Sequence, residues 1–332
     1  MEYRTLGKTG LRVSALGFGC GNIGGLMIRG MPADRERAVA RAIELGITYF
    51  DTAAQYGDGQ SERHLGQVFK ALKPDVYVGT KFRLRSQDMG DIAGATARAL
   101  EASLQRLDME RVNLFQLHNR IGAQRSADAD VLSVTDVVET VVPALQTLQQ
   151  QGKTQFYGIT GLGETPALHQ VIDAGVLDTV QVCYNLLNPS AGFDVPTGYP
   201  AQDYGRLLEH TQGQQTGVIV IRVLAAGALS GSEARHPVAS STPAPIGSGP
   251  DYATDVQHAQ MLSTLVQEDH AQNLVEASLR FALSASPVST ILLGYSSLEH
   301  LEFAAEAIAK GPLSSEALAR LAGLWAQFVS AM

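Results

Sequence analysis

A regular alternation of short apolar runs with longer segments of helical periodicity is the sequence feature that most constrains the fold. Eight such runs, rich in β-branched residues, are found at Val13–Phe18, Ile47–Phe50, Val76–Thr80, Val112–Leu117, Thr154–Ile159, Val180–Cys183, Val218–Val223 and Thr290–Leu293. The helical segments between and after them are Asp34–Leu45, Ser61–Leu72, Ile92–Leu107, Thr135–Gln151, Thr165–Ala174, Ala201–Gln212, one that ends near Ala282, and Ser296–Ala309. Eight strand–helix pairs predict an α/β protein built as a single (β/α)8 barrel, which we expect to span residues 1–332 as one domain.

An open, doubly wound sheet is the alternative arrangement for alternating strands and helices. Its dinucleotide-binding form places a GxGxxG turn between the first strand and a helix. Residues 18–25 read Phe-Gly-Cys-Gly-Asn-Ile-Gly-Gly, and Met, Arg, Gly and Pro follow rather than a helical pattern. The sequence therefore favours the closed TIM barrel.

Three connections are longer than usual for this fold: Asn119–Val134, Leu186–Pro200 and Ala225–Gln257. Each follows a strand, so we expect all three on the C-terminal face of the barrel. The stretch His236–Pro250 is rich in Pro, Ser and Gly, which predicts mobility without ligand. A surface insertion and a substrate lid both fit it. Leu313–Val329 predicts an extra amphipathic C-terminal helix.

Composition and charge exclude several classes of protein. The net charge is -8, so we expect no nucleic acid partner. No apolar run is long enough for a membrane span and no signal-like segment begins the chain, so we expect no membrane partner and a cytoplasmic location. Cys20 and Cys183 lie outside any CxxC or metal-ligand spacing, so we expect no disulfide and no metal. The oligomeric state is left open.

Four polar side chains stand where the second, third and fourth strands end. Asp51 follows the strand Ile47–Phe50, Lys81 directly follows Val76–Thr80, His118 follows Leu117, and Tyr56 lies five residues beyond Asp51. Each has an ordinary structural explanation when taken alone, as a turn cap, a surface lysine, a core histidine or a packing aromatic. Barrel active sites are assembled from the C-terminal ends of several strands, so we expect the four to converge on one part of the mouth.

The four residue types suit proton transfer during carbonyl reduction. Hydride arriving at a carbonyl carbon leaves an alkoxide that needs a proton, and a phenol with a pKa of about 10 donates poorly unless its anion is stabilised. We expect Lys81 to supply that stabilisation and Asp51 to hold Lys81 charged. His118 would donate to the carbonyl oxygen and orient it.

These motifs resemble the aldo-keto reductase superfamily. The resemblance is carried by Asp-Thr-Ala and Tyr-Gly near Asp51, by Gly-Thr-Lys-Phe and Leu-His after the next strands, and by Arg-Thr-Leu-Gly-Lys-Thr-Gly-Leu near the N-terminus. It implies a barrel that acts as an NAD(P)-dependent oxidoreductase on a small carbonyl or alcohol. Asp51, Tyr56, Lys81 and His118 would then be catalytic, with Tyr56 the general acid or base, and the substrate would contact Tyr56, His118 and Asn119.

The resemblance also implies a set of residues around the nucleotide. They are Gly19, Cys20, Gly21, Asp51, Thr160, Gly161, Gln181, Ile221, Arg222, Leu224, Gly227, Leu229, Gly294, Ser296, Ser297 and His300. Gly161 has no amide where the family has asparagine, and Ile221 stands where it often has a stacking tyrosine. Arg222 replaces a serine and could meet the pyrophosphate or ribose, or pair with a carboxylate in the mouth.

The choice of cofactor is less constrained than the class of reaction. Family frequency favours NADP(H), but Ser296 replaces a lysine or arginine of strictly NADP-using members, so NAD(H) stays open. A nucleotide-binding regulatory subunit with little turnover is the alternative function. A barrel lyase or isomerase without nicotinamide is a third.

Overall fold

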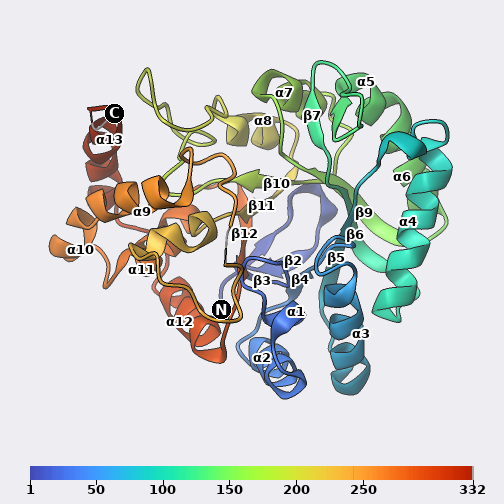
Figure 1. The fold of residues 1–332 in the computed structure, drawn as a ribbon, viewed down its shortest axis with the longest axis horizontal. Coiled ribbons are helices and arrows are strands. Elements are labelled where there is room, and N and C mark those ends of the chain that lie inside the picture. The colour runs from blue at the N-terminus through green and yellow to red at the C-terminus, as the bar shows by residue number, and fades with distance from the viewer. Residues whose placement is uncertain (242, 331–332) are drawn as a thin grey trace.

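The computed structural model describes residues 1–241 and 243–330, and within them eight parallel strands close into a barrel (Figure 1). In sequence order the barrel strands are β3 (Leu16–Gly19), β4 (Tyr49–Asp51), β5 (Tyr77–Phe82), β6 (Val112–Leu117), β9 (Thr154–Thr160), β10 (Thr179–Cys183), β11 (Gly217–Ile221) and β12 (Val288–Gly294). Each pairs in parallel with the next, and β12 closes onto β3. The predicted fold class is confirmed.

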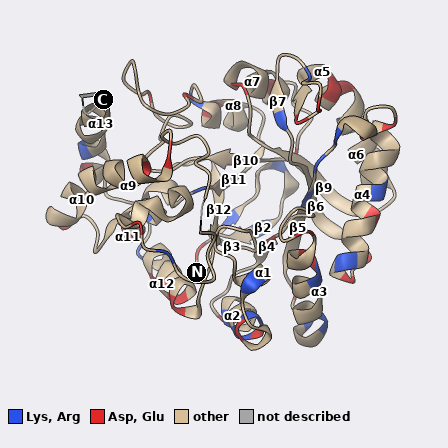
Figure 2. Ribbon diagram, viewed as in Figure 1, with Lys and Arg blue, Asp and Glu red and all other residues tan. Residues whose placement is uncertain are grey.

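Helices surround the strands on the outside. They are α1 (Leu26–Arg29), α2 (Pro32–Glu44), α3 (Gln60–Leu72), α4 (Ile92–Leu107), α5 (Val134–Asp136), α6 (Val142–Gln150), α7 (Thr165–Asp173), α8 (Leu207–Gly213), α9 (Tyr252–Met261), α10 (Thr264–Gln267), α11 (Leu274–Leu283), α12 (Leu298–Ala309) and α13 (Ser315–Ser330). Basic and acidic residues are interspersed along these outer helices (Figure 2). Each long helix buries one apolar stripe against the strands, as the helical period of the sequence predicts.

A small antiparallel hairpin closes the N-terminal end of the barrel. It consists of β1 (Tyr3–Thr5) and β2 (Arg12–Ser14) joined through the 3-10 turn Gly7–Thr9. Leu6 and Val13 from this hairpin enter a separate buried cluster with three barrel residues, Tyr49, Leu114 and Ile219. The predicted strand Val13–Phe18 is therefore two strands, because the chain leaves the hairpin at Ala15, whose N–H donates to Glu2 O, before β3 begins.

Two predicted helices differ from the structure. Thr135–Gln151 is divided by a π-helical turn at Val137–Val141, which ends two residues before Pro143, a residue with no N–H to continue an α-helical ladder. Ala201–Gln212 is helical only from Leu207, because Arg206 has a φ of 58° and Tyr204 N–H donates to the Ser190 hydroxyl instead. Both differences come from local hydrogen bonding that apolar periodicity does not report.

The long loops carry structure of their own. β7 (Arg120–Gly122) and β8 (Val131–Ser133) pair inside the first loop, and a 3-10 turn (Ala225–Ser230) and α9 occupy parts of the third. The predicted C-terminal helix is confirmed as α13, and Trp325 on it donates to Leu186 O in the second loop at 2.9 Å.

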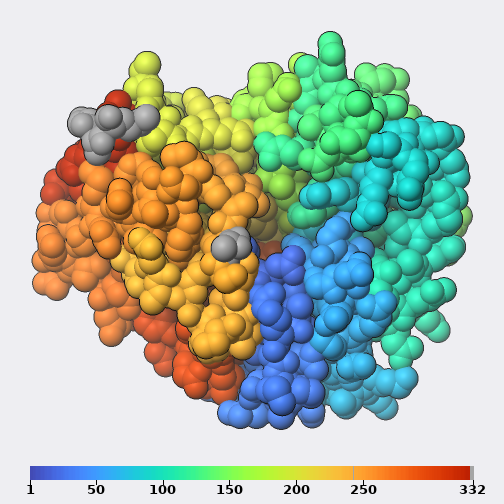
Figure 3. Space-filling model, in the orientation of Figure 1, coloured from blue at the N-terminus to red at the C-terminus, as the bar shows by residue number. Residues whose placement is uncertain are grey.

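The stretch His236–Pro250, apart from Thr242, which lies outside the described residues, is tied to the segment after β3. Ser240 N–H donates to Ile23 O at 3.0 Å, and Arg29 donates to Val238 O at 2.7 Å and to Asn22 O at 2.6 Å. Figure 3 shows this yellow and orange part of the chain meeting the blue N-terminal part. The loop therefore contacts the segment that follows β3 at the barrel mouth, and its mobility without ligand stays a prediction.

Cys20 and Cys183 are both free and buried. Over the described part of the chain, no helix has the length and apolar character that crossing a membrane requires.

Candidate active site

The four predicted tetrad residues lie together at the C-terminal ends of β4, β5 and β6. Asp51 is the last residue of β4 and Lys81 the penultimate residue of β5, while His118 directly follows β6. Tyr56 lies in the turn after β4, where Gly57 and Gly59 have φ values of 58° and 79° that favour glycine. The parallel register of three neighbouring strands therefore brings all four to one place.

Lys81 is the centre of the contacts among them. Its Nζ forms an ion pair with Asp51 Oδ1 and donates to Thr52 O at 2.8 Å and to Tyr56 Oη at 3.1 Å. The Lys81 and Asp51 side chains are fully buried, so the ammonium has given up its hydration for these acceptors. Nζ also lies 4.7 Å from the centroid of the Tyr56 ring. The ammonium is thus fixed directly beside the phenol oxygen.

The charge states follow from burial and from this pairing. Burial alone would lower the pKa of Lys81, but Asp51 and Tyr56 outweigh it, so the pKa is raised and Lys81 stays protonated. Burial raises the pKa of Asp51, although Lys81 opposes that effect. Burial and then the charges of Lys81 and Arg83 lower the pKa of His118 to about 3. His118 is therefore a neutral imidazole at physiological pH.

A hydrogen-bond path connects Asp51 with His118. Gln181 Nε2 donates to Asp51 Oδ2 at 2.8 Å, the Thr160 hydroxyl lies 3.3 Å from Gln181 Oε1, and His118 Nδ1 lies 2.7 Å from that hydroxyl. Nδ1 thus faces the protein, which leaves Nε2 to face a substrate. The His118 and Tyr56 rings meet edge to face with centroids 6.4 Å apart.

Tyr49 belongs to the site and was missed in the sequence. Its hydroxyl donates to Asp51 Oδ2 at 2.9 Å from inside the barrel, and its side chain is fully buried. Tyr49 precedes Asp51 by two residues on β4, and alternate residues of a strand point to the same face. This alternation was the signal that could have found it.

Asn119 is a correction to the predicted substrate contacts. Its side chain is fully buried, its Nδ2 donates to Leu84 O and Ala129 O at 2.8 Å each, and its Oδ1 accepts from Leu84 N at 2.9 Å. All of its hydrogen-bonding atoms are thus engaged in holding two loops together. No group of Asn119 is free for a substrate.

The residues predicted for the nicotinamide end are brought to the same opening. Gly19 ends β3, and a Cβ added at Gly21 would lie 3.5 Å from the Tyr56 ring, so Gly21 faces the phenol. Gly161 N–H donates to Gln181 O at 2.8 Å. The Cys20 side chain is buried, as is that of Leu229 in the turn after β11, so only the backbone of either residue is placed to meet a nucleotide.

The chain after β11 has an unusual backbone. Arg222, Ala225, Ala226 and Gly227 have φ values of 60°, 45°, 61° and 108°, which are left-handed and costly for the three that are not glycine. Ile221 precedes this run and Leu224 lies within it, and both are half-buried. Left-handed residues in a turn can expose backbone N–H groups to an anion, and here the Ala225 and Gly227 N–H groups donate to Arg222 O and Leu224 O at 2.7 Å each.

Arg222 is held within the mouth with part of its hydrogen-bonding capacity unused. Its Nη2 donates to Ala244 O at 2.7 Å, and its buried Nε has no acceptor. Among the ion pairs of the described chain none involves Arg222. Of the two roles predicted from the sequence, pairing with a carboxylate of the mouth is therefore not observed.

The predicted adenosine end lies where β12 leads into α12. Gly294 ends β12, and the buried Ser296 hydroxyl donates to Gly24 O at 2.7 Å. Ser297 is the N-cap of α12, its hydroxyl accepting from His300 N–H at 3.4 Å. The His300 ring lies 5.9 Å from that of His236 in the bridging loop.

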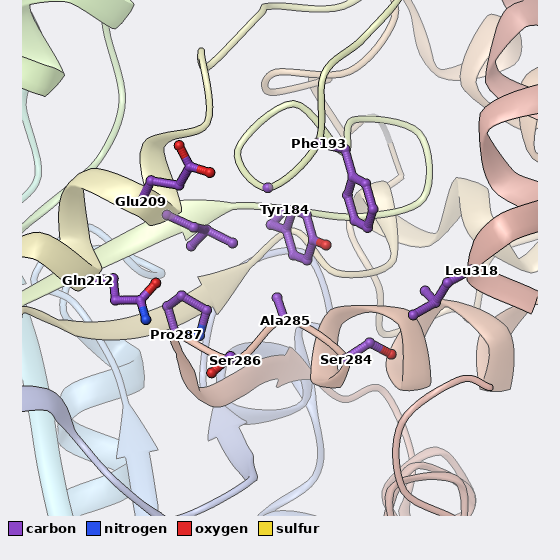
Figure 4. Close-up of a pocket in the computed structure, with 11 residues that line it drawn as sticks. Tyr184, Phe193, Glu209, Gln212, Ser284, Ala285, Ser286, Pro287 and Leu318 are labelled. Atoms are coloured by element: carbon purple, nitrogen blue, oxygen red, sulfur yellow. The ribbon is translucent and has the colours of Figure 1, made fainter. Parts of the chain in front are cut away.

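A separate pocket of about 210 Å³ lies outside the barrel between α8, the α11–β12 turn and α13 (Figure 4). Tyr184, Phe193 and Glu209 are among its lining residues. None of the predicted site residues lines it, so the tetrad remains the candidate site.

Comparison with known proteins defines the class. The model of the Aldo/keto reductase family matches residues 15–326. The chain belongs to this family and is an NAD(P)-dependent oxidoreductase, as the resemblance implied. It is 29% identical over 311 residues to L-galactose dehydrogenase of Arabidopsis thaliana, covering 91% of this chain and 86% of that protein.

Further similarities extend over nearly the whole chain. L-glyceraldehyde 3-phosphate reductase of Escherichia coli is 26% identical over 350 residues, covering 97% of this chain and 91% of that protein. An aldo/keto reductase of Klebsiella pneumoniae, solved with NADP and acetate, superposes with a TM-score of 0.68 at 23% identity, covering 98% of this chain and 96% of that one. The structural likeness supports the barrel fold.

Proposed function

We propose that the protein interconverts a small carbonyl and the corresponding alcohol, with Tyr56 as the proton donor in reduction and the acceptor in oxidation. The observation that carries this proposal is the buried Lys81 ammonium, which contacts both Asp51 and the Tyr56 hydroxyl. A phenolate left after proton donation would lie 3.1 Å from that ammonium. The charge that develops in the reaction therefore meets a fixed opposite charge in a dry site.

His118 and Tyr56 would hold the carbonyl oxygen between them. The single Thr160 hydroxyl proton can go to Gln181 Oε1, 3.3 Å away, or to His118 Nδ1, 2.7 Å away. When it is donated to Nδ1, the ring proton of the neutral imidazole lies on Nε2 and is available to the substrate oxygen. Asp51 acts through Lys81, and Tyr49 acts through Asp51, to which its hydroxyl donates. Gln181 Nε2 also donates to Asp51.

The residues of the mouth fit a nicotinamide nucleotide. The buried, unpartnered Nε of Arg222 and the left-handed run through Gly227 suit a pyrophosphate, and the Ser297-capped start of α12 suits a phosphate of the adenosine half. Gly19 and Gly21, with Gly161 and the nearby Thr160 and Gln181, would surround the nicotinamide, which supplies or accepts the hydride when bound. NADP(H) is the favoured cofactor, in line with the NADP complex of the Klebsiella relative.

Hydroxylated aldehydes and sugars are the substrate class we favour. Both curated relatives described above are named for sugar or triose chemistry.

A coupled absorbance assay tests the function. Purified protein is mixed with NADPH or NADH and a panel of aldehydes, ketones and sugars, and the reduced-nicotinamide band is followed. We expect turnover with at least one sugar-type carbonyl and a preference for NADPH. Tight binding of either nucleotide without turnover across the panel would instead favour a regulatory role.

A further inference from the structure

The glycines that follow β3 differ in what requires them. A Cβ added at Gly24 would lie 2.5 Å from the backbone at the end of β12, and Gly25 has a φ of 79° that favours glycine. Gly21 has neither constraint. Its φ is not left-handed, and the three heavy atoms nearest to an added Cβ, all of Tyr56, would lie 3.5 to 3.8 Å away, in ordinary van der Waals contact. The fold itself therefore does not require glycine at position 21.

The backbone around Gly21 is held against the elements that carry the tetrad. Cys20 N–H donates to Asp51 O at 2.9 Å, and Cys20 O accepts from the Ser61 hydroxyl at 2.9 Å. Gly21 O accepts from Gly25 N–H at 3.1 Å. The position of Gly21 relative to the site is thus set by hydrogen bonds, so the direction of a side chain added there is defined.

A side chain at position 21 would enter the space beside the proton-donating oxygen. The added Cβ would lie 3.5 Å from Cε2 and Cζ of Tyr56 and 3.8 Å from its Oη. A carbonyl oxygen that accepts the phenol proton lies about 2.7 Å from Oη, so the reacting carbon and its substituents follow directly beyond it. A methyl group at position 21 would compete with those atoms for the same space.

Gly21 and the residues proposed for the nicotinamide approach the site from opposite sides of the mouth. Thr160 ends β9 and Gly161 follows it, and β9 lies opposite β3 in the closed order of the barrel strands. Tyr56, which would contact the carbonyl oxygen, is instead the residue nearest to the added Cβ. The space beside Gly21 therefore faces the reacting carbon, while the Gly21 backbone stays available to the nucleotide.

We propose that Gly21 is a specificity-determining residue, whose missing side chain makes room for a second substituent on the reacting carbon. Ketones, secondary alcohols and the cyclic hemiacetal forms of sugars then fit as well as aldehydes do. This inference rests on the proposed function and defines the shape of the substrate that it accepts. When such an alcohol or hemiacetal is oxidised, the C–H hydrogen leaves as hydride to the oxidised nicotinamide, the O–H proton passes to Tyr56, and a ketone or a lactone forms.

The test compares isomers that differ only in where the carbonyl group lies. Dihydroxyacetone is set against glyceraldehyde, and butan-2-one against butanal, with the wild type, Gly21→Ala and Gly21→Ser. The matched control is Gly213→Ala, because Gly213 ends α8 on the outside of the barrel and a Cβ added there would meet no neighbouring group within 4 Å. The nucleotide Kd of each variant is measured by titration.

We expect the wild type to turn over both members of at least one pair. Gly21→Ala and Gly21→Ser should lower kcat/KM for the ketone about 10-fold or more relative to its aldehyde isomer, because one carbon atom in a pocket changes discrimination by about that factor. Gly213→Ala should leave the ketone-to-aldehyde ratio unchanged. Retained turnover of the aldehydes shows that the variants fold.

Several results would overturn the proposal, and they differ in what else they remove. If the wild type accepts only aldehydes, or if both Gly21 variants leave the ketone-to-aldehyde ratio unchanged, the role of Gly21 is refuted and the proposed function stands. If the variants weaken nucleotide binding enough to account for the lost turnover, the space belongs to the nicotinamide and not to the substrate. If the wild type turns over none of the four compounds with either nucleotide, the proposed function fails for small carbonyl compounds and the inference fails with it.

Discussion

At the residue scale, the side chains of the candidate site are linked by hydrogen bonds and do not act as four separate groups. Tyr56, Lys81 and Asp51 form one arm, and Gln181 and Thr160 connect Asp51 to His118. The tetrad could be predicted because each strand end is marked in the sequence by a polar residue after an apolar run. The connecting bonds could not be predicted, because they join residues up to 130 positions apart.

Thr160 tests whether the orientation of His118 matters. Thr160→Val removes the hydroxyl that contacts Nδ1 and keeps the side-chain shape, and a hydrogen bond contributes about 1 to 1.5 kcal/mol, so we expect kcat to fall about 5- to 10-fold. Thr160→Ser keeps the hydroxyl and should stay within about 2-fold of the wild type. Steady-state kinetics at saturating nucleotide measure both, and a wild-type kcat for Thr160→Val would contradict the role of the path.

The acid side of the pH profile provides a second residue-scale prediction. The folded pKa of His118 is about 3, below its ordinary value, so the imidazole stays neutral and its charge does not change between pH 5 and 8. We therefore expect no loss of kcat from His118 protonation in that range. A decline in kcat below pH 7 that disappears in His118→Gln would contradict the low pKa.

At the element scale, an ion pair ties the middle of the loop between β6 and α5 to the start of α5. Arg125 Nε donates to Asp136 at 2.9 Å, and Asp136 also accepts from Ser133 N–H at 2.9 Å as the capping box of α5. The bond from Arg125 holds the pKa of Asp136 at about 2, below the ordinary value of an aspartate. This pairing fixes the loop that carries β7 and β8.

Asp136→Asn is expected to destabilise the fold in a pH-dependent way. A depressed folded pKa gives stability that is present above the unfolded pKa of about 3.9 and is lost as the pH falls toward 2. Arg125 is 41% exposed, so solvent screening reduces the effect to about 1 kcal/mol at pH 7. Urea unfolding should show this difference at pH 7 and a smaller one at pH 3, while the exposed control Asp34→Asn changes stability by less than about 0.5 kcal/mol. An equal loss at both pH values would refute the ionic origin.

At the scale of the whole molecule, the closed barrel and α13 could be predicted because apolar periodicity records burial, and eight repeats fit only a few architectures. The hairpin β1–β2, the β7–β8 pair and the late start of α8 could not, because short strands and loop turns depend on contacts with distant backbone. Arg4, for example, donates to Val288 O at 2.9 Å across almost the whole chain length. Asn119 was wrongly predicted to contact the substrate for the same reason. Its side-chain direction is set by hydrogen bonds to the backbone of Leu84 and Ala129, which apolar periodicity does not record.

The central claim is that the barrel brings Tyr56 to a carbonyl as its proton donor. The most direct test is Tyr56→Phe, with kcat measured on an accepted carbonyl and the nucleotide Kd measured by titration. The account predicts that kcat falls by about 100-fold or more while Kd stays within a few-fold, because only the donated proton is removed. Near wild-type kcat in Tyr56→Phe, or a loss of nucleotide binding that accounts for the lost activity, would contradict it.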